Sequence, residues 1–113
     1  MKFREREIDK LKIFEIYDNF FQDTGIAEFQ KSIMAALNNG NKVFVIDLGG
    51  VEHINSIGLA ALVRAYTSTK KAGADMILTS LTLKVKEMLS ITRIDTLFTI
   101  YNTTEEAVLD CTD

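Results

Sequence analysis

The stretch VFVIDLGGVEHINSIGLAALVRAY, residues 43–66, decides the fold of this chain. It begins with the unbroken apolar run Val-Phe-Val-Ile at 43–46, which is typical of a strand covered on both faces, as in a parallel or mixed sheet under helices. After a turn at Gly49-Gly50 and a short loop, the apolar residues take up helical spacing from Ser56 onward. A buried strand followed by an amphipathic helix is a building unit of α/β domains.

Further elements of both kinds are predicted on either side of this stretch. Upstream, alternating apolar residues predict one or two strands that form a hairpin around Asp9-Lys10. A helix over 26–40 follows, because its apolar residues fall at helical spacing and the sequence Asn-Gly ends it in the expected way. Downstream, the same patterns predict strands at 74–80 and 95–101 and helices at 81–92 and 104–110.

This order of elements predicts an α/β fold. We expect one domain over residues 1–113, with a mixed central β-sheet of about four to five strands packed by about four helices. Crossovers between parallel neighbours are expected to be right-handed.

The composition excludes several classes of function. A net charge of −3 gives no basic surface for nucleic acid. No apolar run approaches the roughly 20 residues of a membrane span, and the charged N-terminus is unlike a secretory signal. One cysteine, Cys111, and one histidine do not supply the ligands of a Cys/His metal site. We therefore expect a cytoplasmic protein without metal or cofactor that does not insert into membranes.

Ser56 lies where the loop ends and the predicted helix begins, and two roles are open for its hydroxyl. It can accept a hydrogen bond from a free backbone N–H of the first turn, as serine commonly does at this position. It can also carry a phosphate, because a helix N-terminus has partial positive charge and unpaired N–H groups. A phosphoserine would add roughly 1.5 to 2 negative charges to this surface.

The motif Asn55-Ser56-Ile57-Gly58-Leu59, placed after a hydrophobic strand that ends in Asp47, resembles the centre of a STAS domain (sulfate transporter and anti-sigma factor antagonist). In that family the strand leads through a short loop to an Asp-Ser-x-Gly-Leu motif, and the resemblance covers roughly residues 10–109. Two features depart from the family pattern. Asn55 stands where the family usually has Asp, and DNFFQDTG replaces its early Gly-x-Leu-Asp turn.

The resemblance implies a free-standing anti-sigma factor antagonist, a phosphorylation-switched binding module of bacterial transcription regulation rather than an enzyme. It implies that Ser56 accepts phosphate from a serine kinase of the histidine-kinase-like ATPase fold, which is also the anti-sigma factor. A PP2C-type phosphatase would remove the phosphate. Asp47 would support the site. The residues implied at the partner surface are Asn55, Ser56, Ile57, Gly58, Leu59 and, from the early loop, Asp23.

Three other functions are weighed against this one. A STAS subunit can dock on a transporter or in a stress-sensing complex without being phosphorylated. A response-regulator receiver would take phosphate on Asp47. That chemistry needs a pair of acidic residues after the first strand to hold a metal ion, and a lysine after a late strand. Asp18 has no second acidic residue beside it, and no lysine follows Lys86. A small α/β enzyme would need a Gly-rich phosphate loop, a Ser-His-Asp set or a metal cluster, and none is visible.

Overall fold

The computed structural model describes residues 3–17 and 25–111 of the 113-residue chain. Its elements, in chain order, are β1 (Phe3–Ile8), β2 (Leu11–Tyr17), α1 (Gly25–Asn38), β3 (Val43–Gly50), α2 (Ser56–Lys71), β4 (Asp75–Thr79), α3 (Leu83–Ile91), the short 3-10 helix η2 (Ile94–Thr96), β5 (Thr99–Tyr101) and α4 (Thr104–Cys111). The predicted α/β fold with a mixed sheet of about four to five strands is confirmed, and the sheet has five.

The strands lie in the order β1-β2-β3-β4-β5. β1 and β2 pair antiparallel, and every later neighbour pair is parallel. The hairpin predicted at Asp9-Lys10 is confirmed. Both turn residues have positive φ, 47° and 76°, as in the hairpin turns whose twist matches that of the strands.

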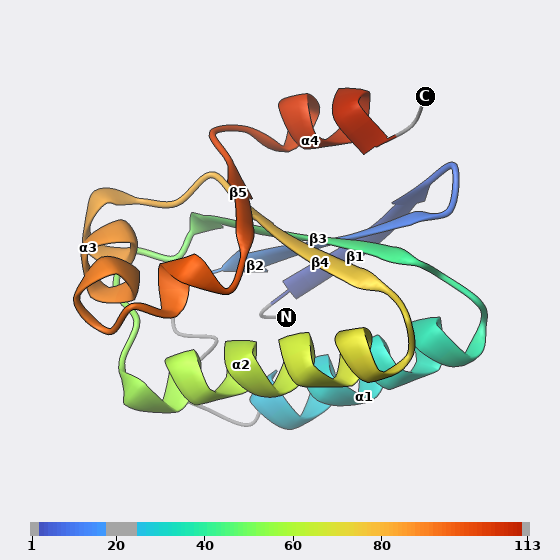
Figure 1. Ribbon diagram of the computed structural model, residues 1–113, viewed down its shortest axis with the longest axis horizontal. Coiled ribbons are helices and arrows are strands. Elements are labelled where there is room, and N and C mark those ends of the chain that lie inside the picture. The colour runs from blue at the N-terminus through green and yellow to red at the C-terminus, as the bar shows by residue number, and fades with distance from the viewer. Residues whose placement is uncertain (1–2, 18–24, 112–113) are drawn as a thin grey trace.

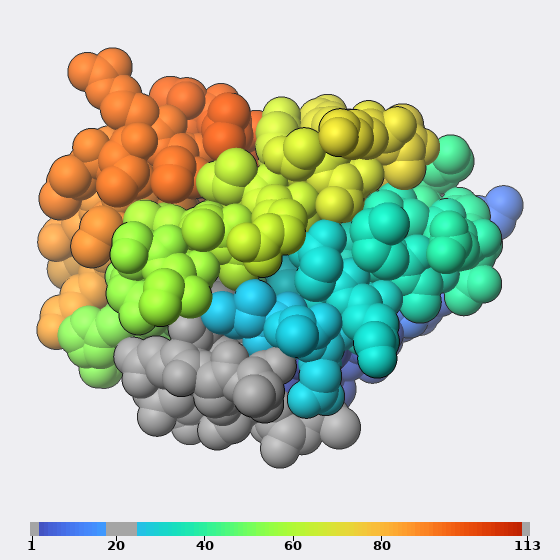
Figure 2. Space-filling view, turned by 90° about the horizontal axis from the view of Figure 1, so that it is seen from below, coloured from blue at the N-terminus to red at the C-terminus, as the bar shows by residue number. Residues whose placement is uncertain are grey.

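Helices cover both faces of the sheet (Figure 1). α1 and α2 pack side by side on one face over the larger core, and Figure 2 shows them from that side with α3 beside the N-terminal half of α2. α4 lies on the other face, where Ala107 packs against Val45 in a smaller core. Phe44 and Ile46 belong to the larger core, so the continuous apolar run of β3 is covered on both faces as predicted.

The last strand is shorter than predicted. The strand expected over 95–101 begins only at Thr99, because the residues before it form η2 and a core contact. Arg93 adopts a left-handed backbone with φ 63° ahead of η2, and the ring of Phe98 packs edge-on against Tyr66 with centroids 5.1 Å apart. Phe98 and, in part, Ile94 therefore pack in the larger core, while Leu97 is exposed, and none of the three pairs with β4.

Candidate functional site

The site is built on the loop between the carboxyl end of β3 and α2, which is the functional edge of α/β sheets. β3 runs two residues further than expected and ends at Gly50. A Cβ atom at Gly50 would lie 2.7 Å from the carbonyl oxygen of Ile16, so no other residue fits there without movement of the backbone. This close approach sets the direction in which the chain leaves the sheet.

The loop between β3 and α2 is held by two buried side chains and by a hydrogen bond from the start of α3. Val51 is fully buried and Ile54 is 7% exposed, so two apolar side chains anchor it in the core. The hydroxyl of Thr82, at the start of α3, donates a hydrogen bond of 2.9 Å to the carbonyl oxygen of Val51. The exposed loop residue His53 pairs with Glu52, with 3.0 Å between Nε2 and Oε1. The first turn of α2 is therefore presented by an anchored loop.

Asn55, not Ser56, caps α2. The side-chain oxygen of Asn55 accepts a hydrogen bond of 2.9 Å from the backbone N–H of Gly58, and Asn55 has the extended backbone of an N-cap residue. Ser56 is the first helical residue and is exposed. Its hydroxyl makes no hydrogen bond within the part of the chain that the structure describes. The capping role considered for Ser56 is therefore wrong, because the preceding residue fills it.

The motif presents three of its five residues at the surface. Asn55 and Ser56 are exposed, and the Ile57 side chain is 62% exposed. Gly58 and Leu59 are buried, and Leu59 packs in the larger core. The expectation that Gly58 and Leu59 are exposed to a partner is corrected, because both residues are buried and Leu59 packs in the larger core.

The electrostatic setting of Ser56 suits an anion. The first turn of α2 holds no acidic residue, and backbone N–H groups at a helix N-terminus carry partial positive charge. A phosphate on the first helical residue would lie beside these groups without competing for the cap, which Asn55 provides. The first turn of α2 therefore carries the Ser56 hydroxyl, the exposed apolar side chain of Ile57 and the partial positive charge of the helix N-terminus.

Asp47 supports the site from the end of β3. Its Oδ1 atom accepts a hydrogen bond of 2.9 Å from the backbone N–H of Gly49. Its Oδ2 atom accepts one of 2.8 Å from the hydroxyl of Thr104, the first residue of α4. The buried hydroxyls of Thr79 and Thr104 lie 2.7 Å apart and complete the chain of hydrogen bonds. Both carboxylate oxygens of Asp47 thus accept hydrogen bonds, one from the loop and one from α4.

Thr104 is a functional-site residue that no local sequence pattern indicates. It lies 57 residues from Asp47 in the chain, and only the fold brings them together. Asp23, predicted at the partner surface, lies outside the described residues.

Two further findings concern metal binding and membrane crossing. Within residues 3–17 and 25–111, no group of three acidic, cysteine or histidine side chains could hold a metal ion. Over the same residues, no helix has the length and apolar character needed to cross a membrane.

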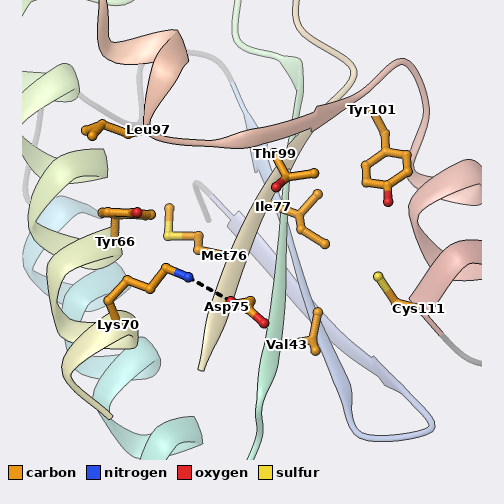
Figure 3. A pocket seen from close by; sticks show the side chains of 10 residues that line it. All are labelled: Val43, Tyr66, Lys70, Asp75, Met76, Ile77, Leu97, Thr99, Tyr101 and Cys111. Carbon is orange, nitrogen blue, oxygen red and sulfur yellow. Dashed lines mark hydrogen bonds and ion pairs between the residues drawn. The ribbon is translucent and has the colours of Figure 1, made fainter. Parts of the chain in front are cut away.

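A small cavity of about 280 Å³ lies at the opposite end of the strands (Figure 3). Lys70, from the end of α2, and Asp75, at the start of β4, form an ion pair of 2.8 Å beside it. The hydrogen bond from Lys70 to Asp75 raises the pKa of the lysine above its ordinary value. Because these residues lie at the amino ends of the strands, the cavity is not part of the Ser56 site.

The sequence is similar to one protein family and to a relative within it. The STAS domain family model matches residues 6–107. A candidate anti-sigma factor antagonist of Thermotoga maritima is 38% identical over 73 residues, which are 64% of this chain and 64% of that protein. The match thus spans slightly less than two thirds of that relative's length.

Solved structures resemble the whole fold. The crystal structure of a candidate anti-sigma factor antagonist from Thermotoga maritima superposes with a TM-score of 0.82 at 26% identity, covering 98% of this chain and 95% of the other. A STAS domain protein from Planctomyces limnophilus gives a TM-score of 0.83 at 24% identity and covers 98% of each chain, which is a likeness of fold.

Proposed function

The chain belongs to the STAS domain family, and we propose that it is an anti-sigma factor antagonist whose binding to its partner is switched by phosphorylation of Ser56. One observation carries the proposal: the Ser56 hydroxyl is exposed and has no hydrogen-bond partner in the described chain, while Asn55 caps the helix. A hydroxyl that is not needed for the fold is free to be modified. The sequence similarity to a candidate anti-sigma factor antagonist supports the assignment.

A phosphate at this position changes the surface but not the fold. It adds roughly 1.5 to 2 negative charges beside Ile57, an apolar side chain 62% exposed. A partner that packs on the neutral surface must then desolvate the phosphate or leave it unpaired, which weakens binding. The helix N-terminus stabilises the phosphate electrostatically, so the modified protein stays folded.

The proposed partner is a serine kinase of the histidine-kinase-like ATPase fold that also acts as the anti-sigma factor. It binds the unmodified chain and thereby releases a sigma factor, and it transfers phosphate from ATP to Ser56. A PP2C-type phosphatase restores the binding form. We propose that these steps take place in the cytoplasm and need no catalytic group of this chain.

The test uses the purified chain with each serine kinase of this fold from its own organism. We expect Ser56→Ala to bind one of these kinases and to receive no phosphate from ATP. We expect Ser56→Asp to weaken that binding by about tenfold or more. Ser90→Asp is the matched control, because Ser90 is an exposed helical serine on α3, and it should bind as the unmodified chain does.

Equal binding of the Ala and Asp variants of Ser56, without phosphate transfer, would contradict the switch. The chain would then be a docking subunit of a transporter or a stress-sensing complex.

A further inference from the structure

The sheet face that carries α4 is only partly covered. α4 packs over β3 and β4, where Ala107 meets Val45 and Ile77. The β1–β2 hairpin extends beside α4 on this face (Figure 1). Between the two lies an open groove of about 350 Å³, lined by Arg6, Ile8, Thr104, Glu105, Val108 and Leu109.

The groove has an apolar floor and an apolar residue on its rim. Ile8 and Val108 pack partly against the smaller core below it. Leu109, on the solvent side of α4, is 74% exposed. Leu109 therefore extends the apolar lining of the groove to the solvent-facing side of α4.

The two walls of the groove carry opposite charge. On the β1 wall, Arg4 and Arg6 share one carboxylate, that of Glu15, at 3.9 and 3.8 Å, so one positive charge is left over. On the α4 wall, the Glu105 side chain makes no ion pair or hydrogen bond among the described residues, whereas the Glu106 carboxylate accepts a hydrogen bond from the backbone N–H of Thr103. The groove therefore offers a spare cation on one side and a spare anion on the other.

We propose that this groove is the interface between two copies of the chain. A twofold axis makes any interface self-complementary, because each contact occurs twice with the roles exchanged. Here the axis can set Glu105 of each copy against Arg6 of the other and bring the two Leu109 side chains into the grooves. The charge complementarity and the exposed leucine are both satisfied by a second copy, and no other partner has to be assumed.

The free edge of β1 does not offer a competing route to a symmetric dimer. Arg4 and Arg6 lie on the α4 face of the sheet, in register with Glu15 and Ile13, while Glu5 lies in register with Phe14 on the other face. Antiparallel pairing of two β1 strands around a twofold axis keeps each face on the same side. It would place arginines opposite arginines and glutamates opposite glutamates, which is unfavourable.

The dimer would leave both phosphorylation sites accessible. Ser56 begins α2, which packs on the opposite face of the sheet from α4 (Figure 1). The assembly would thus present two copies of the Ser56 surface, so a dimeric or clustered partner could be held by both at once. This inference does not depend on the phosphorylation of Ser56.

The test is sedimentation equilibrium of the full chain over micromolar to millimolar concentrations. We expect a monomer–dimer equilibrium whose dissociation constant rises by about tenfold or more in Leu109→Asp, Arg6→Glu and Glu105→Arg. Combining Arg6→Glu with Glu105→Arg restores the opposite charges and should recover most of the dimer. Ile91→Asp is the control, because Ile91 is equally exposed, at 78%, but lies at the end of α3.

Circular dichroism of each variant separates loss of the dimer from loss of the fold. A chain that is monomeric at every concentration would overturn the proposal. So would a dimer that is unchanged by all three groove substitutions, or one that the double charge exchange fails to recover.

Discussion

The side-chain oxygen of Asn55 accepts a hydrogen bond of 2.9 Å from the backbone N–H of Gly58. Because Asn55 caps α2, the Ser56 hydroxyl is not needed to cap the helix. If α2 began one residue later, Ser56 would be its N-cap, and phosphorylation of Ser56 would remove the capping hydrogen bond. With Asn55 in that place, the hydroxyl of the next residue is structurally spare.

The first prediction distinguishes the roles of Asn55 and Ser56 by the free energy of unfolding of their alanine variants. Asn55→Ala removes the cap and should lower the free energy of unfolding by about 0.5–2 kcal/mol. Ser56→Ala removes no hydrogen bond of the described chain and should change it by only about 0.5 kcal/mol or less. Urea titration followed by circular dichroism measures both. A larger loss in Ser56→Ala than in Asn55→Ala would show that the serine is the cap.

A second prediction concerns the sign of the field at Ser56. Ser56→Asp should be as stable as Ser56→Ala or more stable, and Ser56→Lys should be less stable, by about 0.3–1 kcal/mol at low ionic strength. The reason is that the partial positive charge of the helix N-terminus attracts a carboxylate and repels an ammonium group. Added salt should reduce the difference. If Ser56→Lys were the more stable of the two, the favourable setting for phosphate would be refuted.

A third prediction tests the hydrogen bonds that join Asp47 to α4. Thr104→Val keeps the shape of the side chain but leaves Asp47 and the buried Thr79 hydroxyl without their common partner. It should cost about 1–3 kcal/mol in the free energy of unfolding. Thr67→Val is the matched control, because the exposed Thr67 hydroxyl bonds only to a carbonyl of its own helix. Equal costs in the two variants would mean that the contact with Asp47 contributes nothing.

The fourth prediction is a pH dependence at alkaline pH. The hydroxyl of Tyr101 donates a hydrogen bond to Asp110, and this bond raises the pKa of Tyr101 from 10.0 to about 12. Because the pKa is higher in the folded state, the stabilisation is complete below pH 10.0 and is lost as the pH rises toward about 12.

Ultraviolet titration of the three tyrosines measures this effect directly. One tyrosine should ionise late, Tyr101→Phe should remove that phase, and Asp110→Asn should move it toward pH 10.0. Simultaneous ionisation of all three tyrosines in the unmodified chain would contradict the assignment.

Local patterns predicted most of the fold. The buried run at 43–46 predicted a strand covered on both faces, and Phe44 and Val45 do pack on opposite sides of the sheet. The strand predicted at Phe98 is wrong, because an apolar residue beside a strand gives the same local pattern whether it belongs to the strand or packs in the core. Its contact with Tyr66 depends on tertiary structure that no local pattern reports.

The site was predicted less completely than the fold. The sequence placed Ser56 at the start of a helix, but choosing between Asn55 and Ser56 as the cap requires a helix boundary accurate to one residue. The link between Asp47 and Thr104 joins the central strand to the last helix, 57 residues apart in the chain, and had no local signal. The groove beside α4 was not visible at all, since it depends on how far a short helix covers the sheet.

The most direct test of the central claim is mass spectrometry of the protein taken from its own cells, growing and stressed. Trypsin cleaves after Lys42 and Arg64, and the resulting peptide, 43–64, contains Ser56 as its single hydroxyl-bearing residue. Because Asp47 and His53 lie on the same peptide, fragmentation then assigns an added phosphate to Ser56. We predict a phosphate on Ser56 whose occupancy differs between growing and stressed cells. A peptide that stays unmodified in both conditions, while the chain still binds its partner, would contradict the proposed switch.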